Sequence, residues 1–334
     1  MTNPANYPDT PVHAIRIHEH GGPEMMKWEI VEVGAPGPGE VRIKHTAVGL
    51  NYIDTYHRTG MYKILMPTVL GREGAGVIEA VGANVNDLKV GDRVAYASSP
   101  IGSYAEARLM PAERVVKVPD NVSDQQATSI MLKGMTAQYL LRRTFKVGPG
   151  VTILFHAAAG GVGQIVSQWA RHLGATVIGT VGNTAKATIA TKAGCHHVIN
   201  YSTEDFVARV AEITGGKKCD VVYDGVGKDT FLKSLDCVRP LGTVVLFGNA
   251  SGKVEPLDLN LLAAKGSLFV TRPTLDTFVA KREELVATAN ELFDVVGRGI
   301  VKIDINQTYP LKDAAQAHRD LEARKTTGST VLIP

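Results

Sequence analysis

The chain has 334 residues, of which 44% are hydrophobic and 21% are charged, which is typical of a globular protein in water. At roughly 100–200 residues per domain, this length predicts two domains. The net charge of +3 is too small to favour nucleic acid or a membrane surface as a partner.

Other features of the composition indicate a cytoplasmic protein. The N-terminal segment lacks the apolar stretch of a signal peptide, and no apolar run reaches the roughly 20 residues of a membrane helix. The three cysteines have no CxxC spacing, which favours a reducing compartment over a disulfide framework.

The first 130 residues are predicted to be rich in β-structure. Short β-prone runs alternate there with turn signals such as GAPGPGE and VGD, a pattern typical of a small barrel-like domain. The predicted strands are Val12–Ile17, Val41–Val48, Ala75–Val81, Arg93–Tyr96 and Tyr104–Leu109.

From Ser123 onward the pattern changes to alternating helices and strands. Ser123 and Gln126 form a capping box that predicts a helix running toward Phe145. The apolar run VTILF then predicts a parallel strand buried on both faces. Further strands are predicted at His197–Asn200, Val221–Tyr223, Thr243–Gly248 and Ser267–Pro273, and helices around Glu204–Ile213, Asp229–Cys237 and Lys281–Val296, before a last β-segment at Thr330–Ile333. This alternation predicts a doubly wound parallel sheet.

A glycine-rich turn, AAAGGVGQ, follows VTILF directly and precedes a predicted helix. In this context it predicts a dinucleotide-binding loop, in which Gly160 lets the backbone approach a pyrophosphate and Gly163 lets the helix pack closely on the sheet. Alanine replaces the first glycine of the usual pattern, so the turn is expected to differ. The predicted contacts in this loop are Ala158, Gly160, Gly161, Val162 and Gly163.

The next strand ends in GTVGNTAKA, where an NAD-specific protein usually carries an acidic residue for the ribose diol. No Asp or Glu lies between Asp124 and Glu204. A 2′-phosphate would instead be attracted by Lys186, with Gly182 leaving room and Tyr201 at the adenosine end, so we expect NADPH as the cofactor. Lys186 as an ordinary solvated helix charge remains the alternative.

Several motifs together resemble the medium-chain dehydrogenase/reductase superfamily. They are AAxGGVG, GREGAG (Gly71–Gly76), VGDRV (Val90–Val94) and LKGMTA (Leu132–Ala137). Within this superfamily, the chain resembles the zinc-free quinone oxidoreductases, a branch that includes zeta-crystallin. The segments that carry this resemblance are VGLNYIDTYHRTGMY (Val48–Tyr62), VINY, FGNASG, GSLFVTRP and YPLKDAAQAH.

The resemblance implies an α/β protein with a GroES-like, partly open β-barrel catalytic domain and a Rossmann domain. The expected catalytic domain comprises residues 1–131 and 273–334, and the expected NADPH-binding domain comprises residues 132–272. The active cleft is expected at the junction of the two domains.

Site residues are also implied by the resemblance. Asn51, Tyr62 and Asp54 are the candidate catalytic residues, with Asn51 or Tyr62 donating a hydrogen bond to the substrate oxygen. A contact of Tyr62 with the cofactor phosphates is the alternative. Further cofactor contacts are expected from Tyr56, Thr136, Phe247, Asn249, Ser251 and Arg324. For Arg324, a charge at a helix C-terminus is an equal alternative.

We expect no metal site. Zinc-dependent relatives carry a cysteine where this chain has Asn51 and a histidine where it has Arg72, and neither an amide nor a guanidinium is a zinc ligand. Quinones and conjugated enones need less activation than alcohols, because the charge delivered with the hydride is delocalised.

These features predict an NADPH-dependent quinone oxidoreductase that transfers hydride directly. An alkenal or enone reductase with the same cofactor, and a non-enzymatic crystallin-like or RNA-binding protein, remain as alternatives. The resemblance also implies a homodimer formed through the edge strand Ser267–Pro273.

Overall fold

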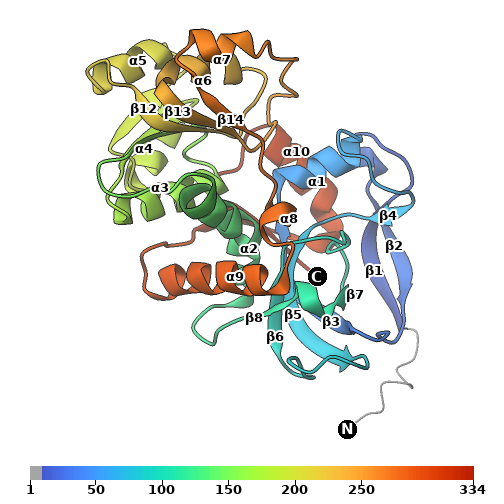
Figure 1. Ribbon diagram of the computed structural model, residues 1–334. Helices are drawn as coiled ribbons and strands as arrows, with labels where there is room; N and C mark the ends of the chain where they lie inside the picture. Colours follow the sequence, from blue (N-terminus) through green and yellow to red (C-terminus); the bar gives the residue numbers. More distant parts are fainter. Residues whose placement is uncertain (1–9) are drawn as a thin grey trace. The chain divides into compact units, whose positions relative to one another are not determined.

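The computed structural model describes residues 10–334 (Figure 1). The chain divides into two compact units. Unit 1 contains the residues up to Leu132 together with Val279–Phe293 and Ile303–Pro334, and unit 2 contains Lys133–Phe278 and Asp294–Lys302. Among the described residues, no helix is both long and apolar enough to cross a membrane.

Unit 1 is built mainly from antiparallel strands. A seven-stranded sheet has the order β15-β16-β3-β5-β6-β8, with β7 paired to β3, and a second sheet has the order β2-β1-β4. The strands are β1 (Thr10–Ile17), β2 (Lys27–Val33), β3 (Glu40–Leu50), β4 (Thr68–Val69), β5 (Glu73–Val81), β6 (Arg93–Tyr96), β7 (Ala107–Pro111), β8 (Val116–Lys117), β15 (Ile305–Pro310) and β16 (Ser329–Ile333). Its helices include α1 (Tyr52–Thr59) and α10 (Ala314–Glu322).

The core of unit 1 joins segments that are distant in the sequence. Ile15, Val48 and Leu70 pack there against Leu332 of β16 and Ala317 of α10. Because β16 pairs with β3 through Thr330↔Leu50, the C-terminal segment completes the sheet that carries α1 at its end.

Unit 2 contains a six-stranded parallel sheet of order β11-β10-β9-β12-β13-β14 (Figure 1). This is the strand order of a Rossmann fold, so the predicted doubly wound sheet is confirmed. Its strands are β9 (Thr152–Phe155), β10 (Thr176–Val181), β11 (His197–Asn200), β12 (Cys219–Asp224), β13 (Val238–Leu246) and β14 (Phe269–Thr271). Its helices include α3 (Gly161–His172), α4 (Thr184–Lys192), α5 (Phe206–Ile213), α6 (Phe231–Cys237), α7 (Asn260–Ala264) and α8 (Leu275–Phe278).

Two helices cross from one unit to the other along the chain: α2 (Asp124–Tyr139) and α9 (Arg282–Gly297). The predicted capping box of α2 is present, since Gln126 N donates to Ser123 Oγ at 3.1 Å and Ser123 N donates to Gln126 Oε1 at 2.9 Å. The helix then continues as a π-helical turn over Leu140–Thr144.

The structure differs from the sequence interpretation in several details. The predicted strand Tyr104–Leu109 begins only at Ala107, because Tyr104 N donates to Leu70 O, Ala105 N donates to Ser103 O, and Ala105 forms only an isolated bridge with Ala14. Residues 273–278 and 294–302, expected in the catalytic domain, lie in unit 2. There the amide of Gln168 bonds to both backbone groups of Lys302, at 2.9 and 3.1 Å.

Candidate functional site

The glycine-rich loop leads from β9 into α3. Gly160 is the N-cap of α3 and is extended, and Gly160 N donates to Ala157 O at 2.9 Å. The left-handed residue of the turn is Ala157, with φ 57°, whereas Ala158 is fully buried and donates its N–H to Thr180 O. The backbone strain expected from the missing first glycine therefore falls at Ala157 and not at Ala158.

Gly163 lies in the first turn of α3, where space is very limited. A Cβ at this position would lie 2.6 Å from both Ala157 O and Ala158 O, while one at Gly160 would have a single contact of 3.2 Å. The absence of a side chain at Gly163 thus lets the start of α3 lie close to the loop. Because little surrounds Gly160, the backbone of Gly160 is accessible. Free N–H groups at such a helix start suit a pyrophosphate, so the loop fits a dinucleotide.

The adenosine-ribose end is expected where β10 leads into α4. Asn183 caps α4, since its Oδ1 accepts from Lys186 N at 2.9 Å, which places the half-buried Lys186 in the first turn. Tyr201 is 42% exposed, and its hydroxyl would lie 2.7 Å from a Cβ at Gly182, so glycine is needed there to admit the ring. The first turn of α4 contains no acidic residue, so the start of α4 suits a 2′-phosphate.

The segment after β13 carries three predicted contacts. Phe247 packs against Phe155 with 5.5 Å between ring centroids, and Asn249 is buried. Ser251 Oγ donates to Val226 O at 2.9 Å and accepts from Asp229 N at 3.0 Å, so it fixes the neighbouring loop. Thr136 is buried on α2 in the same unit.

A buried polar network that the sequence interpretation missed lies at the carboxyl ends of β9, β10 and β12. Asp224 accepts from Val226 N, Gly227 N, Thr230 Oγ1 and Ser234 Oγ at 2.7–2.9 Å. His156, which directly precedes the glycine loop, lies 3.0 Å from Ser234 Oγ and 2.9 Å from Thr180 Oγ1. Burial lowers the pKa of His156, and the charge of Asp224 acts in the opposite direction.

This network holds the strand ends next to the loop in fixed register. Polar residues at the carboxyl ends of parallel strands were the available sequence signal, because ligands of such sheets bind there. His156 and Asp224 both occupy such positions, at the ends of VTILF and DVVYD.

In unit 1, the candidate catalytic residues gather at the start of α1. Asn51 is the N-cap, and its backbone N–H donates to Asp54 Oδ2 at 2.9 Å. Its side-chain Nδ2 donates to Glu73 Oε2 at 2.7 Å, so the orientation of the amide is defined by a buried carboxylate. Tyr56 packs edge-on against the half-buried Tyr62, with 5.2 Å between ring centroids.

Asp54 is fully buried, which distinguishes it from the other candidates. Burial raises its pKa to about 7, the hydrogen bonds from Asn51 N and Tyr104 oppose this rise, and the nearby charges of Glu73 and Arg72 act in opposite directions. Asn51 N and the hydroxyl of Tyr104 both donate to Oδ2, so Asp54 is a buried acceptor that connects these two groups.

Arg324 and Tyr56 belong to unit 1, whereas the glycine loop and Lys186 belong to unit 2. Arg324 follows α10 as an exposed residue in the left-handed region, with φ 58°, and its charge opposes the rise that burial causes in the pKa of Tyr52. Contact of Arg324 or Tyr56 with a cofactor therefore stays a prediction.

Asn51 and Arg72, which the resemblance places at the metal-ligand positions of zinc enzymes, are both buried. Within residues 10–334, no three His, Cys, Asp or Glu side chains gather as a metal-ligand set.

Comparison with known proteins gives two family matches and many full-length relatives. Residues 37–120 match the alcohol dehydrogenase GroES-like domain, and residues 161–290 match the zinc-binding dehydrogenase family. The chain is 52% identical to a quinone oxidoreductase from Pseudomonas aeruginosa, over 96% of this chain and 99% of that protein. It is 51% identical to a 2-haloacrylate reductase from Burkholderia sp, over 97% of this chain and 99% of that protein.

Among solved structures, similarity extends over the full length as well. The Escherichia coli quinone oxidoreductase complexed with NADPH matches with a TM-score of 0.95 and 48% identity, covering 96% of this chain and 100% of that chain. A 2-haloacrylate reductase matches with a TM-score of 0.87 and 51% identity, covering 97% of this chain and 99% of that chain.

Proposed function

Because the chain belongs to the quinone oxidoreductase branch of the medium-chain dehydrogenase/reductase superfamily, we propose that it is an NADPH-dependent quinone oxidoreductase. The observation that supports this most directly is the pairing of a narrow glycine loop at α3 with the basic first turn of α4. Together they suit a dinucleotide with an extra phosphate. The three cysteines are buried free thiols, which is consistent with our proposal of a cytoplasmic protein.

Asn51 and Tyr62 are our proposed donors to the substrate oxygen. When bound, NADPH supplies the hydride from its nicotinamide C4. Because Glu73 accepts one N–H of the Asn51 amide, the amide nitrogen is held toward Glu73 and the amide oxygen points away from Glu73. A fixed donor stabilises the negative charge on a quinone oxygen, and neither Asn51 nor Arg72 is of a type that binds zinc.

A steady-state screen of NADPH oxidation tests this function. We expect turnover with 1,4-benzoquinone and 9,10-phenanthrenequinone, and a much lower rate with NADH. A second candidate is reduction of an activated alkene, favoured by the 51% identity to a 2-haloacrylate reductase. If 2-chloroacrylate or a short enone is reduced and both quinones are not, the second candidate replaces the first.

Replacement of Lys186 tests its proposed contact with the 2′-phosphate. We expect Lys186→Ala to raise the KM for NADPH about tenfold, which corresponds to about 1.4 kcal/mol, and to leave the KM for NADH unchanged. The matched control is Lys192→Ala, at the other end of α4. Equal changes in both KM values would exclude a role in recognising the extra phosphate.

We further propose that the protein is a homodimer, formed through β14. This strand is an edge of the parallel sheet, and its Phe269 is 62% exposed. An exposed apolar edge strand offers unpaired backbone groups with which a strand of another chain can pair. We expect light scattering at micromolar concentration to give the mass of two chains, and Phe269→Asp to give one, while Leu232→Asp on α6 leaves the mass unchanged. A monomeric wild-type protein would contradict this proposal.

A further inference from the structure

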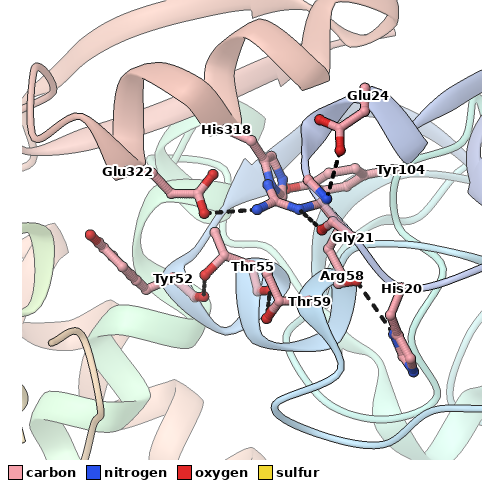
Figure 2. A network of polar contacts seen from close by, with 11 residues as sticks. His20, Gly21, Glu24, Tyr52, Thr55, Arg58, Thr59, Tyr104, His318 and Glu322 are labelled. Carbon is pink, nitrogen blue, oxygen red and sulfur yellow. Dashed lines mark hydrogen bonds and ion pairs between the residues drawn. The ribbon is translucent and has the colours of Figure 1, made fainter. Parts of the chain in front are cut away.

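A line of buried polar groups connects α10 with α1 inside unit 1, and the chemistry proposed above does not use it (Figure 2). Glu322 Oε1 accepts from Arg58 Nη2 at 2.7 Å, and Arg58 Nη1 lies 2.9 Å from His318 Nδ1. His318 Nε2 lies 3.0 Å from the hydroxyl of Tyr104, which lies 3.0 Å from Asp54 Oδ2. Only Glu322 at the outer end is appreciably exposed.

The direction of each hydrogen bond in this line is determined by its chemistry. An arginine only donates, so His318 Nδ1 must accept from Arg58. Burial and the charge of Arg58 lower the pKa of His318 to about 3, so the ring is neutral and carries its hydrogen on Nε2. His318 therefore donates to Tyr104, and the hydroxyl of Tyr104 is left to donate to Asp54.

The inner end of the line is the first turn of α1. Asp54 Oδ2 accepts from Tyr104 and from the backbone N–H of Asn51 at the same time. A shift of Asp54 therefore moves the N-cap residue whose side chain is the proposed donor to the substrate. The helix itself adds little freedom, because Thr55 and Thr59 donate their hydroxyls to the carbonyls of Tyr52 and Thr55 (Figure 2).

We propose that Arg58, His318 and Tyr104 are positioning residues, which through Asp54 hold the backbone of Asn51 in the position that hydride transfer to the substrate requires, while Glu73 orients its amide. This inference rests on the proposed function. Hydride transfer is sensitive to misplacement, and a shift of about 1 Å can reduce a rate about 100-fold. The hydrogen bonds of this line each have a fixed donor and acceptor and begin at Arg58. They prevent such shifts without contact with the substrate.

Three variants test the line of hydrogen bonds. Tyr104→Phe removes the donor to Asp54, and His318→Leu removes the donor to Tyr104. We expect each to lower kcat for the quinone about tenfold or more and to leave the Kd of NADPH within about twofold. His318→Gln offers a carbonyl to Arg58 and an N–H to Tyr104, so it preserves the polarity of the line and should recover most of the lost rate.

A matched control is available between β15 and α10. Tyr309 donates to Asp320 Oδ2 at 3.0 Å, which is also a tyrosine–aspartate pair but lies outside the line. Tyr309→Phe should leave kcat unchanged. The proposal would be overturned if Tyr104→Phe lowers kcat no more than Tyr309→Phe does. It would also be overturned if His318→Gln and His318→Leu lower kcat equally.

A readout independent of turnover separates this inference from the proposed function. The backbone amide ¹⁵N shift of Asn51 reports its hydrogen bond to Asp54. We expect this shift to change in Tyr104→Phe and in His318→Leu and to stay unchanged in Tyr309→Phe. If no quinone is reduced but the shift changes as expected, the proposed function fails while the positioning of Asn51 stands; if quinone is reduced and the shift does not change, the positioning fails.

Discussion

Gly163→Val is expected to raise the Kd for NADPH at least about 100-fold and to lower the free energy of unfolding by about 1–3 kcal/mol. The Cβ would lie 2.6 Å from two backbone carbonyl oxygens of the loop, and a backbone atom cannot move aside as a side-chain tip can. The start of α3 must then shift away from β9, which removes the aligned N–H groups that suit the pyrophosphate. Quenching of protein fluorescence by NADPH and urea unfolding measure the two effects.

The control for this variant is Gly148→Val. Nothing lies within 4 Å of a Cβ at Gly148, and its φ is outside the left-handed region, so the same side chain enters open space. We expect its Kd for NADPH and its unfolding free energy to match those of the wild type. Tight NADPH binding by Gly163→Val would show that the loop does not depend on close packing of the helix.

Asp224→Ala is expected to destabilise unit 2 by about 3–5 kcal/mol. The change leaves the backbone N–H groups of Val226 and Gly227 without their acceptor. It also removes the carboxylate acceptor of the Thr230 and Ser234 hydroxyls, which keep only backbone carbonyl acceptors. His156 loses its indirect support through Ser234 as well. Because His156 adjoins the glycine loop, weaker NADPH binding should accompany the loss of stability.

Urea unfolding followed by circular dichroism measures this effect. The control is Asp236→Ala, which removes a partly exposed carboxylate paired with Lys265. Such a pair contributes up to about 1 kcal/mol. Similar losses in the two variants would mean that the buried network contributes no more than a surface ion pair.

The sequence predicted unit 2 better than unit 1 because of how each sheet is buried. Strand β9 is buried on both faces, so its residues form a continuous apolar run that is visible without knowledge of its neighbours. Strand β2 was missed, because only Val33 of its seven residues is buried and Trp28 and Ile30 are exposed. Strand β15, INQTYP, was also missed; it is polar and depends on pairing with β16.

Sequence patterns likewise indicated only part of the candidate site. The glycine loop and the cap of α4 are local in sequence and were predictable from their motifs. The hydrogen bond between Tyr104 and His318 was missed, because 214 positions separate the two residues. No local sequence pattern indicates that either side chain is hydrogen-bonded. Their contact arises from the packing of α10 into the core beside β1 and β3.

The pairing of β16 with β3 has a consequence during synthesis on the ribosome. The first residues of β3 emerge almost 300 positions before the segment that covers Val48–Leu50. Until that segment leaves the exit tunnel, the nascent chain exposes an unpaired stretch of β3 together with apolar side chains such as Leu50. Polypeptides truncated by a premature stop codon before Ser329 should therefore be recognised by chaperones and degraded, even when their nucleotide-binding half has folded.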